Sequence, residues 1–270
     1  MHLTSVLQKL VGGRGHKLFV GVDEYDAPAN QILFDNNSTF YGELSRFFTS
    51  QFFAIIKQAT SEVIDKYWIT GVLPVFRDGV SPLNAVKLIS SRAEYHGLCG
   101  LTENEVYTIT KEYLPPGPLD VDMILQDLRR WYNGHLFCNI QGSGQPLDTL
   151  YSPELVFTHL RALGNNTRIK PIDEIYNVQT SRVLGAIPDN GITPFIETFY
   201  RVQSGNLKAE ILSSFGITEA SQIGINPRIT QTLLYHLGVF TFAADGRNLT
   251  IPNCTMICVV SAAFLYADRR

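Results

Sequence analysis

The sequence predicts an α/β protein joined to a larger, mainly helical region. A short run of apolar residues and glycine, Leu18–Val22, is followed at once by Asp23 and Glu24. Such an unbroken run is typical of a strand buried on both faces, as in a parallel sheet. A helical pattern and a second short apolar run, at residues 66–72, come next, and the later part of the chain has mainly helical periodicity and ends in a hairpin pattern.

Composition places the 270 residues among ordinary globular proteins, with 45% hydrophobic residues, 17% charged residues and a formal net charge of −3. This slightly acidic balance, with no basic block, argues against a dedicated nucleic-acid surface. The four cysteines form no C-x-x-C pair and have no histidine cluster beside them, which argues against zinc. The N-terminal segment lacks the pattern of a secretory signal, so we expect an intracellular protein, cytoplasmic or nuclear.

The acidic pair at the end of the first strand has the pattern of a Walker B element. In open α/β sheets ligands bind at the carboxyl ends of the strands, where Asp23 and Glu24 would lie. There an aspartate holds Mg²⁺, directly or through water, and a following glutamate polarises the attacking water. Thr70 ends the second apolar run, and its hydroxyl would reach a γ-phosphate if the two strands lie parallel and adjacent. The alternative is that the acidic pair merely caps a turn and that Thr70 is an ordinary strand end.

No phosphate-binding loop accompanies these residues in the sequence. The glycine-rich segment G-G-R-G-H-K at residues 12–17 is followed by Leu18 rather than by serine or threonine. It also enters a strand, whereas a phosphate-binding loop leaves a strand and opens a helix. The pattern G-x-x-x-x-G-K-[ST] occurs nowhere in the 270 residues, and we find no acid–lysine cluster of the kind that a nuclease needs.

Periodicity and capping signals divide the rest of the chain. Thr102 and Glu105 form a capping-box pattern that starts a helix at 103–113. Further helices are predicted at 3–11, 40–60, 120–131, from Pro153 after a Ser152 cap, at 172–187, at 192–203 and at 226–237. Residues 238–252 have a β-hairpin pattern, which after a helix suggests a winged-helix-like module. The breaker Pro-Pro-Gly-Pro at 115–118 suggests a division into residues 1–114, 119–253 and a C-terminal tail, 254–270.

The tail contains an apolar stretch near Met256–Ala267. It is shorter than the roughly 20 residues that a membrane-spanning helix needs. We therefore expect a buried hydrophobic segment there rather than a membrane anchor.

Six phrases of the sequence resemble the AAA-ATPase-like family, long known as a domain of unknown function and abundant in fungi and bacteria. They are F-V-G-V-D-E-Y-D-A-P at 19–28, I-T-G-V-L-P at 69–74, G-L-T-E-N-E-V at 100–106, R-W-Y-N-G-H-L-F at 130–137, Y-S-P-E-L-V at 151–156, and L-L-Y-H-L-G-V-F-T-F with L-T-I-P-N at 233–253. Their order is the order of the family, and the resemblance covers about residues 5–253.

The resemblance implies a P-loop NTPase core, related to AAA+ and signal-transducing ATPases, followed by helical and winged-helix-like parts. It places the ligand of ATP and Mg²⁺ at Asp23, the catalytic glutamate at Glu24 and the polar sensor at Thr70. Relatives begin with a Walker A segment similar to R-P-R-R-F-G-K-S, and many continue into a nuclease-like domain, but this sequence contains neither. We therefore expect a partial P-loop sheet whose family function is ATP binding and hydrolysis, and which is inactive by itself.

The alternative is a degenerate scaffold or protein-interaction module that no longer turns over nucleotide. Loop amides and a lysine supply most of the grip on a triphosphate, so we expect ATP and Mg²⁺ to bind weakly or not at all. The strand Leu18–Val22 has no lysine or proline to protect its edge, which favours self-association or an unknown protein partner. Neither a nucleic acid nor a membrane is indicated as a partner.

Overall fold

The computed structural model describes residues 17–30, 47–60, 63–75, 86–114, 120–138, 147–165, 191–216 and 224–267, together with single positions between these ranges. Within them the chain is a mixture of helices and strands. The elements are β1 (Leu18–Val22), the π-helix η1 (Phe47–Phe52), α4 (Phe53–Thr60), β2 (Ile64–Ile69), the 3-10 helix η3 (Ala93–Leu98), α5 (Glu103–Tyr113), α6 (Val121–Tyr132), α7 (Pro153–Gly164), α9 (Ile192–Gln203), α11 (Pro227–His236), β3 (Thr241–Phe242), β4 (Leu249–Thr250) and α12 (Cys254–Ala267).

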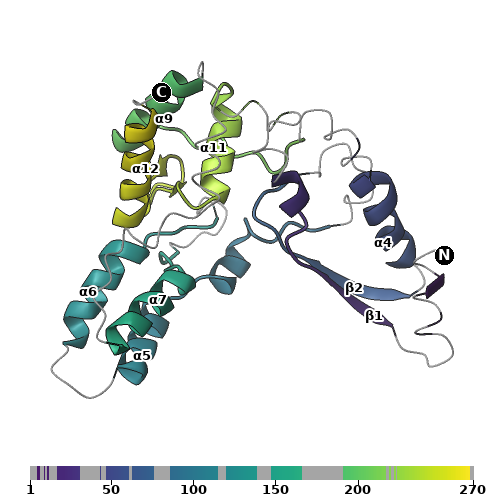
Figure 1. Cartoon of the computed structure of the whole chain (residues 1–270), viewed down its shortest axis with the longest axis horizontal. Helices are drawn as coiled ribbons and strands as arrows, with labels where there is room; N and C mark the ends of the chain where they lie inside the picture. The colour runs from purple at the N-terminus through teal and green to yellow at the C-terminus, as the bar shows by residue number, and fades with distance from the viewer. Residues whose placement is uncertain are drawn as a thin grey trace.

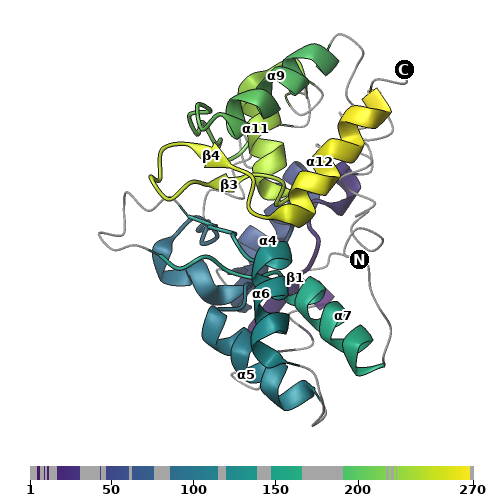
Figure 2. The same cartoon turned by 90° about the vertical axis from the view of Figure 1, so that its left-hand side faces the viewer.

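Two groups of elements lie apart from one another (Figure 1). The parallel strands β1 and β2 lie with η1 and α4 on one side of the molecule, and α5, α6, α7, α9, α11 and α12 lie on the other side. Figure 2 shows α9, α11 and α12 grouped with the β3–β4 hairpin, and α5, α6 and α7 gathered below them. The strand–helix–strand unit that carries the acidic pair is therefore a small, distinct part of the described structure.

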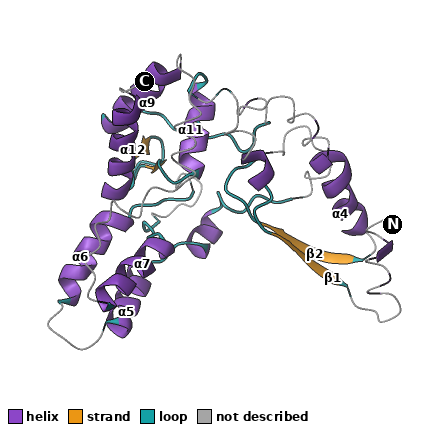
Figure 3. Cartoon of the chain, in the orientation of Figure 1, coloured by secondary structure: helices purple, strands orange, loops and turns teal. Residues whose placement is uncertain are grey.

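The strands β1 and β2 pair in parallel, as the sequence predicts, and Figure 3 shows them as adjacent arrows. Val20 lies opposite Tyr67, and both side chains turn toward the hydrophobic core. The alternate side chains point the other way, and Phe19 and Trp68 are 67% and 45% exposed. Among the described residues the sheet is thus covered on one face and open on the other.

The covered face packs against α4. Phe53, Ile56 and Ala59 of this helix are buried, and the Phe53 ring meets the Tyr25 ring edge to face with the ring centroids 6.3 Å apart. In the described part of the helix predicted at 40–60, a π-helical turn, η1, directly precedes the α-helix that begins at residue 53, and most of residues 40–46 lie outside the described residues. A hydrophobic period of 3.6 residues does not distinguish such a wider turn from an α-helix.

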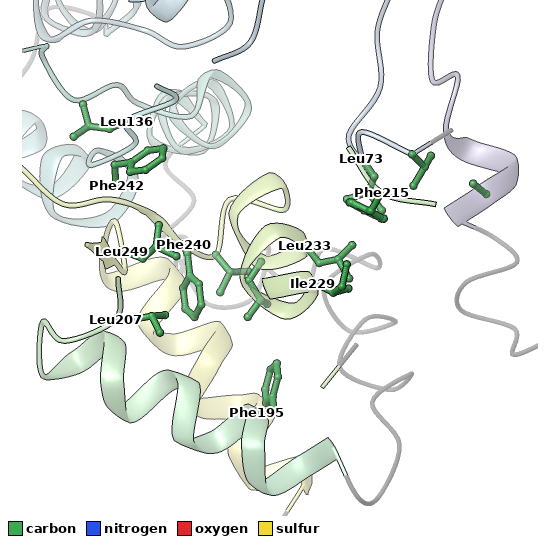
Figure 4. Close-up of a cluster of buried hydrophobic side chains, with 14 of the residues drawn as sticks. Leu73, Leu136, Phe195, Leu207, Phe215, Ile229, Leu233, Phe240, Phe242 and Leu249 are labelled. Carbon is green, nitrogen blue, oxygen red and sulfur yellow. The ribbon is translucent and has the colours of Figure 1, made fainter. Parts of the chain in front are cut away.

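Buried apolar side chains form two clusters. The larger one joins β1, β2 and α4 to α9, α11, α12 and the hairpin (Figure 4). Phe215 is its link between the two sides of the molecule, since it lies beside Leu73 and its N–H donates a 3.3 Å hydrogen bond to the Pro74 carbonyl. The smaller cluster lies between α5, α6 and α7, where Val106, Leu128 and other side chains are fully buried. The division of the chain at 114/119 remains a prediction.

Local capping signals explain where several of the helices begin. The Thr102 side chain accepts a hydrogen bond from the Glu105 N–H and the Glu105 carboxylate accepts one from the Thr102 N–H, so the predicted capping box is confirmed. The Asn226 side chain also caps a helix, α11, because its Oδ1 accepts a hydrogen bond from the Arg228 N–H. Ser152 precedes α7 as predicted, but its side chain makes no capping hydrogen bond. The helices predicted at 3–11 and 172–187 lie outside the described residues, apart from single positions.

The C-terminal part begins with the predicted hairpin, in which β3 and β4 pair antiparallel. The Asp245 carboxylate accepts hydrogen bonds from the N–H groups of Arg247 and Asn248 and so stabilises the turn between them. The tail that follows folds into α12, in which Val260 is buried and Ile257 is 44% exposed. Burial of the apolar stretch is thus found only in part, and the side chains from residue 262 onward lie outside those that the structure describes. Across the parts of the chain that the structure describes, no helix combines the length and apolarity needed to cross a membrane.

Candidate functional site

The ends of β1 and β2 bring Asp23 and Thr70 together. The Thr70 hydroxyl donates a hydrogen bond directly to the Asp23 carboxylate. The pairing of the strands holds the two residues in register, because the Thr70 N–H donates to the Val22 carbonyl at 2.8 Å. Both side chains are exposed. The predicted acid–hydroxyl pair therefore exists as a geometric unit at the carboxyl edge of the sheet.

Glu24 has an unusual backbone conformation. Its φ of +49° lies in the left-handed region, which residues with a Cβ rarely adopt. The Glu24 N–H donates a 3.0 Å hydrogen bond to Oδ1 of Asp23, so the aspartate side chain supports the turn that it precedes. Strained conformations of this kind occur often at functional sites, where the surrounding structure imposes them.

Asp26 is the buried acid of this region. Its side chain is almost fully buried, and its carboxylate accepts hydrogen bonds from the N–H groups of Val72 at 3.1 Å and Leu73 at 2.7 Å. The Asn30 side-chain amide donates a further bond at 2.8 Å. A buried carboxylate surrounded by donors in this way is held in place rather than available to a ligand. Asp26 thus ties the loop after β1 to the loop after β2.

Tyr25 makes a second connection between the same two loops. Its hydroxyl donates to the Leu73 carbonyl at 2.7 Å and approaches the Val75 carbonyl at 3.1 Å. Gly71 lies underneath, and a Cβ atom added there would come within 2.5 Å of the Tyr25 ring and closer still to the Asp26 carboxylate. Glycine is therefore required at residue 71 by close packing, and the two loops form one rigid support for Asp23 and Thr70.

The exposed carboxylate of Asp23 fits a magnesium ion that is held mainly by water and phosphate. Magnesium usually takes only one or two protein carboxylates and keeps several waters. Asp26 is not available as a second ligand because its oxygens accept backbone hydrogen bonds. Within the described residues no group of three or more histidine, cysteine, aspartate or glutamate side chains could hold a metal ion alone. A magnesium ion at Asp23 would therefore need its remaining ligands from water and from a bound phosphate.

The structure brings Asp23, Glu24 and Thr70 together, but the roles expected for them stay predictions. Sequence reasoning missed Tyr25, Asp26 and Gly71. The signal for them was present in the two phrases D-E-Y-D and I-T-G-V-L-P, whose loops lie against each other in the fold. A third acidic residue two positions after Glu24, and a glycine directly after Thr70, could have indicated this contact.

Comparison with known proteins gives a family match that covers the region of the candidate site. Residues 1–81 match the model of the AAA-ATPase-like family, which is described as a predicted AAA-ATPase. No curated protein and no solved structure matches the chain. The phrases beyond residue 81 lie outside the matched segment, so their resemblance to the family remains a prediction. The N-terminal segment that contains Asp23, Glu24 and Thr70 is therefore similar to the AAA-ATPase-like family.

Proposed function

We propose that Asp23, Glu24 and Thr70 form the acidic side of a site for a nucleoside triphosphate and Mg²⁺. The direct hydrogen bond between Thr70 and Asp23, at the ends of adjacent parallel strands, is the observation that carries this proposal. Such strand ends are where open α/β sheets bind ligands, and the family match indicates an ATPase. In this proposal the Asp23–Glu24 pair is a Walker B element and β1–β2 is part of a P-loop sheet.

Each residue then has a distinct task. Asp23 holds the hydrated ion through its exposed carboxylate, and the Thr70 hydroxyl fixes the orientation of that carboxylate. Glu24, which follows Asp23 directly and has a positive φ, orients and polarises the attacking water. A bound Mg²⁺ would neutralise the negative charge of the phosphates.

We further propose that residues 1–270 bind ATP only weakly and do not hydrolyse it unaided. Most of the affinity of P-loop proteins for triphosphate comes from loop amides and a lysine, and the sequence contains no G-x-x-x-x-G-K-[ST]. Isothermal titration of the chain with Mg-ATP tests this. We expect a dissociation constant in the millimolar range, about −4 kcal/mol. A micromolar constant that is lost in Asp23→Asn would instead show that the chain is a competent nucleotide-binding protein.

A protein-interaction role is the second candidate, and the open face of the sheet favours it. Phe19 and Trp68 are large, exposed and on the same outward face of β1 and β2. Exposed apolar groups on an open sheet favour association with another chain. The antiparallel hairpin β3–β4, which follows α11 as in a winged helix, would in this proposal serve the same scaffold function.

A further inference from the structure

A cavity of about 770 Å³ lies along the edge of β2 that faces away from β1. Every residue from Lys66 to Val72 lines it, whereas no residue of β1, all of which the structure describes, takes part. A cavity lined by consecutive residues of one strand, and by none of its neighbour, lies at the open edge of that strand rather than over one face of the sheet. The opposite walls come from the segment Val86–Ser91, from η3 and from the end of α11.

The backbone of β2 presents hydrogen-bonding groups to this cavity. The Thr70 N–H donates to Val22 and the Thr70 carbonyl accepts from the Tyr25 N–H at 3.0 Å, so the backbone of Thr70 faces β1. Successive residues of a strand direct these groups to alternate edges, and Tyr67 and Ile69 therefore turn theirs toward the cavity. Within the described residues, no third strand pairs with β2 there. An edge of this kind is a template for a further strand.

The side chains around the cavity add two further features. Trp68, Tyr95 and Leu98 are large and exposed, so the cavity offers apolar surface that the described residues leave uncovered. Lys66 and Lys87 also line it, and none of the described lining residues is an aspartate or glutamate, although the whole chain has a net charge of −3. The local charge therefore favours an acidic occupant.

We propose that this groove binds an extended segment of another protein, apolar at alternate positions and flanked by acidic residues, which adds to β2 as a further strand. Main-chain hydrogen bonds to Tyr67 and Ile69 supply the register, and alternate apolar side chains cover Trp68 and Leu98. The acidic flanks pair with Lys66 and Lys87. The cavity adjoins the proposed nucleotide site, because Thr70 also lines it, but this binding mode uses the edge of β2 and not the Asp23 carboxylate.

Amide exchange measured by NMR tests the strand pairing in the full chain. The probe is the peptide Glu-Val-Thr-Val-Thr-Val-Glu, whose length matches the run from Lys66 to Val72, and the control is the same peptide N-methylated at its five central residues. We expect the amides of Tyr67 and Ile69 to exchange at least about tenfold more slowly with the probe, whereas those of Trp68 and Thr70, which already face β1, change little. The N-methylated peptide should leave all four rates unchanged.

Fluorescence anisotropy with a labelled form of the probe peptide tests whether the acidic flanks pair with Lys66 and Lys87. The double variant Lys66→Glu/Lys87→Glu should weaken binding by about tenfold or more, while Lys208→Glu, an exposed lysine outside the cavity, should not. The proposal is overturned if the probe does not saturate the protein at about 1 mM, or if the N-methylated peptide binds equally well. It is also overturned if Mg-ATP protects Tyr67 and Ile69 and displaces the probe, because the cavity would then be a nucleotide pocket.

Discussion

The carboxylate of Asp26 accepts a 2.7 Å hydrogen bond from the backbone N–H of Leu73, a residue 47 positions away in the sequence. This contact joins the loop that carries Asp23 to the loop that carries Thr70. The Tyr25 hydroxyl makes a second connection between the two loops, because it donates a hydrogen bond to the Leu73 carbonyl. The hydrogen bond between Asp23 and Thr70 is exposed, whereas the contacts that position it are buried. The stability of the candidate site therefore depends on residues that would not touch a nucleotide.

Asp26→Asn should destabilise the fold strongly. The substitution removes a buried charged acceptor and puts an NH₂ group against backbone N–H donors, which should cost on the order of 3 kcal/mol. Urea unfolding followed by circular dichroism measures the loss. Asp65→Asn is the matched control, because Asp65 is an exposed residue of β2. Equal unfolding free energies for the two variants would contradict the role given to Asp26.

Gly71→Ala should also destabilise the protein, by about 1–3 kcal/mol, because its Cβ would overlap the Tyr25 ring and the Asp26 carboxylate. Gly21→Ala in β1 is the control, since a Cβ added there meets no atom within 4 Å. Alanine should be tolerated at residue 21, and urea unfolding of both variants compares their free energies of unfolding. If Gly71→Ala were as stable as Gly21→Ala, the close packing between the two loops would be wrong.

Acidification should destabilise the protein below about pH 6.5, the ordinary pKa of histidine. Burial lowers the pKa of His135 and of His236 to about 4. Because both groups bind protons more readily in the unfolded chain, stability is complete above pH 6.5 and falls as the pH drops toward 4. The loss should be on the order of 2 kcal/mol for each histidine between pH 6.5 and pH 5.

Urea unfolding at pH 7, 6 and 5 measures this dependence, and His135→Gln should reduce the difference between pH 7 and pH 5. Acidic groups act in a separate, lower range. Hydrogen bonds from the N–H groups of Asn248 and Arg247 lower the pKa of Asp245, so its contribution is lost only at more acidic pH. A stability that did not change between pH 7 and pH 5 would show that the two histidines are accessible to protons in the folded state.

Self-association is expected from the open face of the sheet, to which β1 contributes one large side chain. Of the four apolar side chains of β1, Leu18, Val20 and Val22 pack against the core and Phe19 alone is largely exposed. Size-exclusion chromatography should show species larger than the 30.2 kDa monomer, and Phe19→Ser should shift the population toward the monomer. Met123→Ser, on α6 and 65% exposed, is the control. A monomer at all concentrations would argue against this surface.

Local signals predicted much of the fold. The capping box of Thr102 and Glu105 marks the start of α5, and the periodicity at 192–203 gives the bounds of α9, because both depend on residues within a few turns. The parallel pairing of β1 and β2 and the meeting of Asp23 with Thr70 followed from the order of the two strands. The hydrogen bonds that join Tyr25 and Asp26 to the loop after β2 could not be predicted in the same way, because they connect loops about 47 residues apart.

The most direct test of the nucleotide-site proposal is a two-dimensional ¹H–¹⁵N NMR titration of the full chain with Mg-ATP. The proposal predicts weak, millimolar binding that perturbs the amides of Glu24 and Thr70 first and that disappears in Asp23→Asn. Thr70→Ser, which keeps the hydroxyl bonded to Asp23, should retain the response, whereas Thr70→Val should lose most of it. Perturbations that leave Glu24 and Thr70 unchanged would contradict the nucleotide site, and saturation in the micromolar range would contradict the weak binding that we propose.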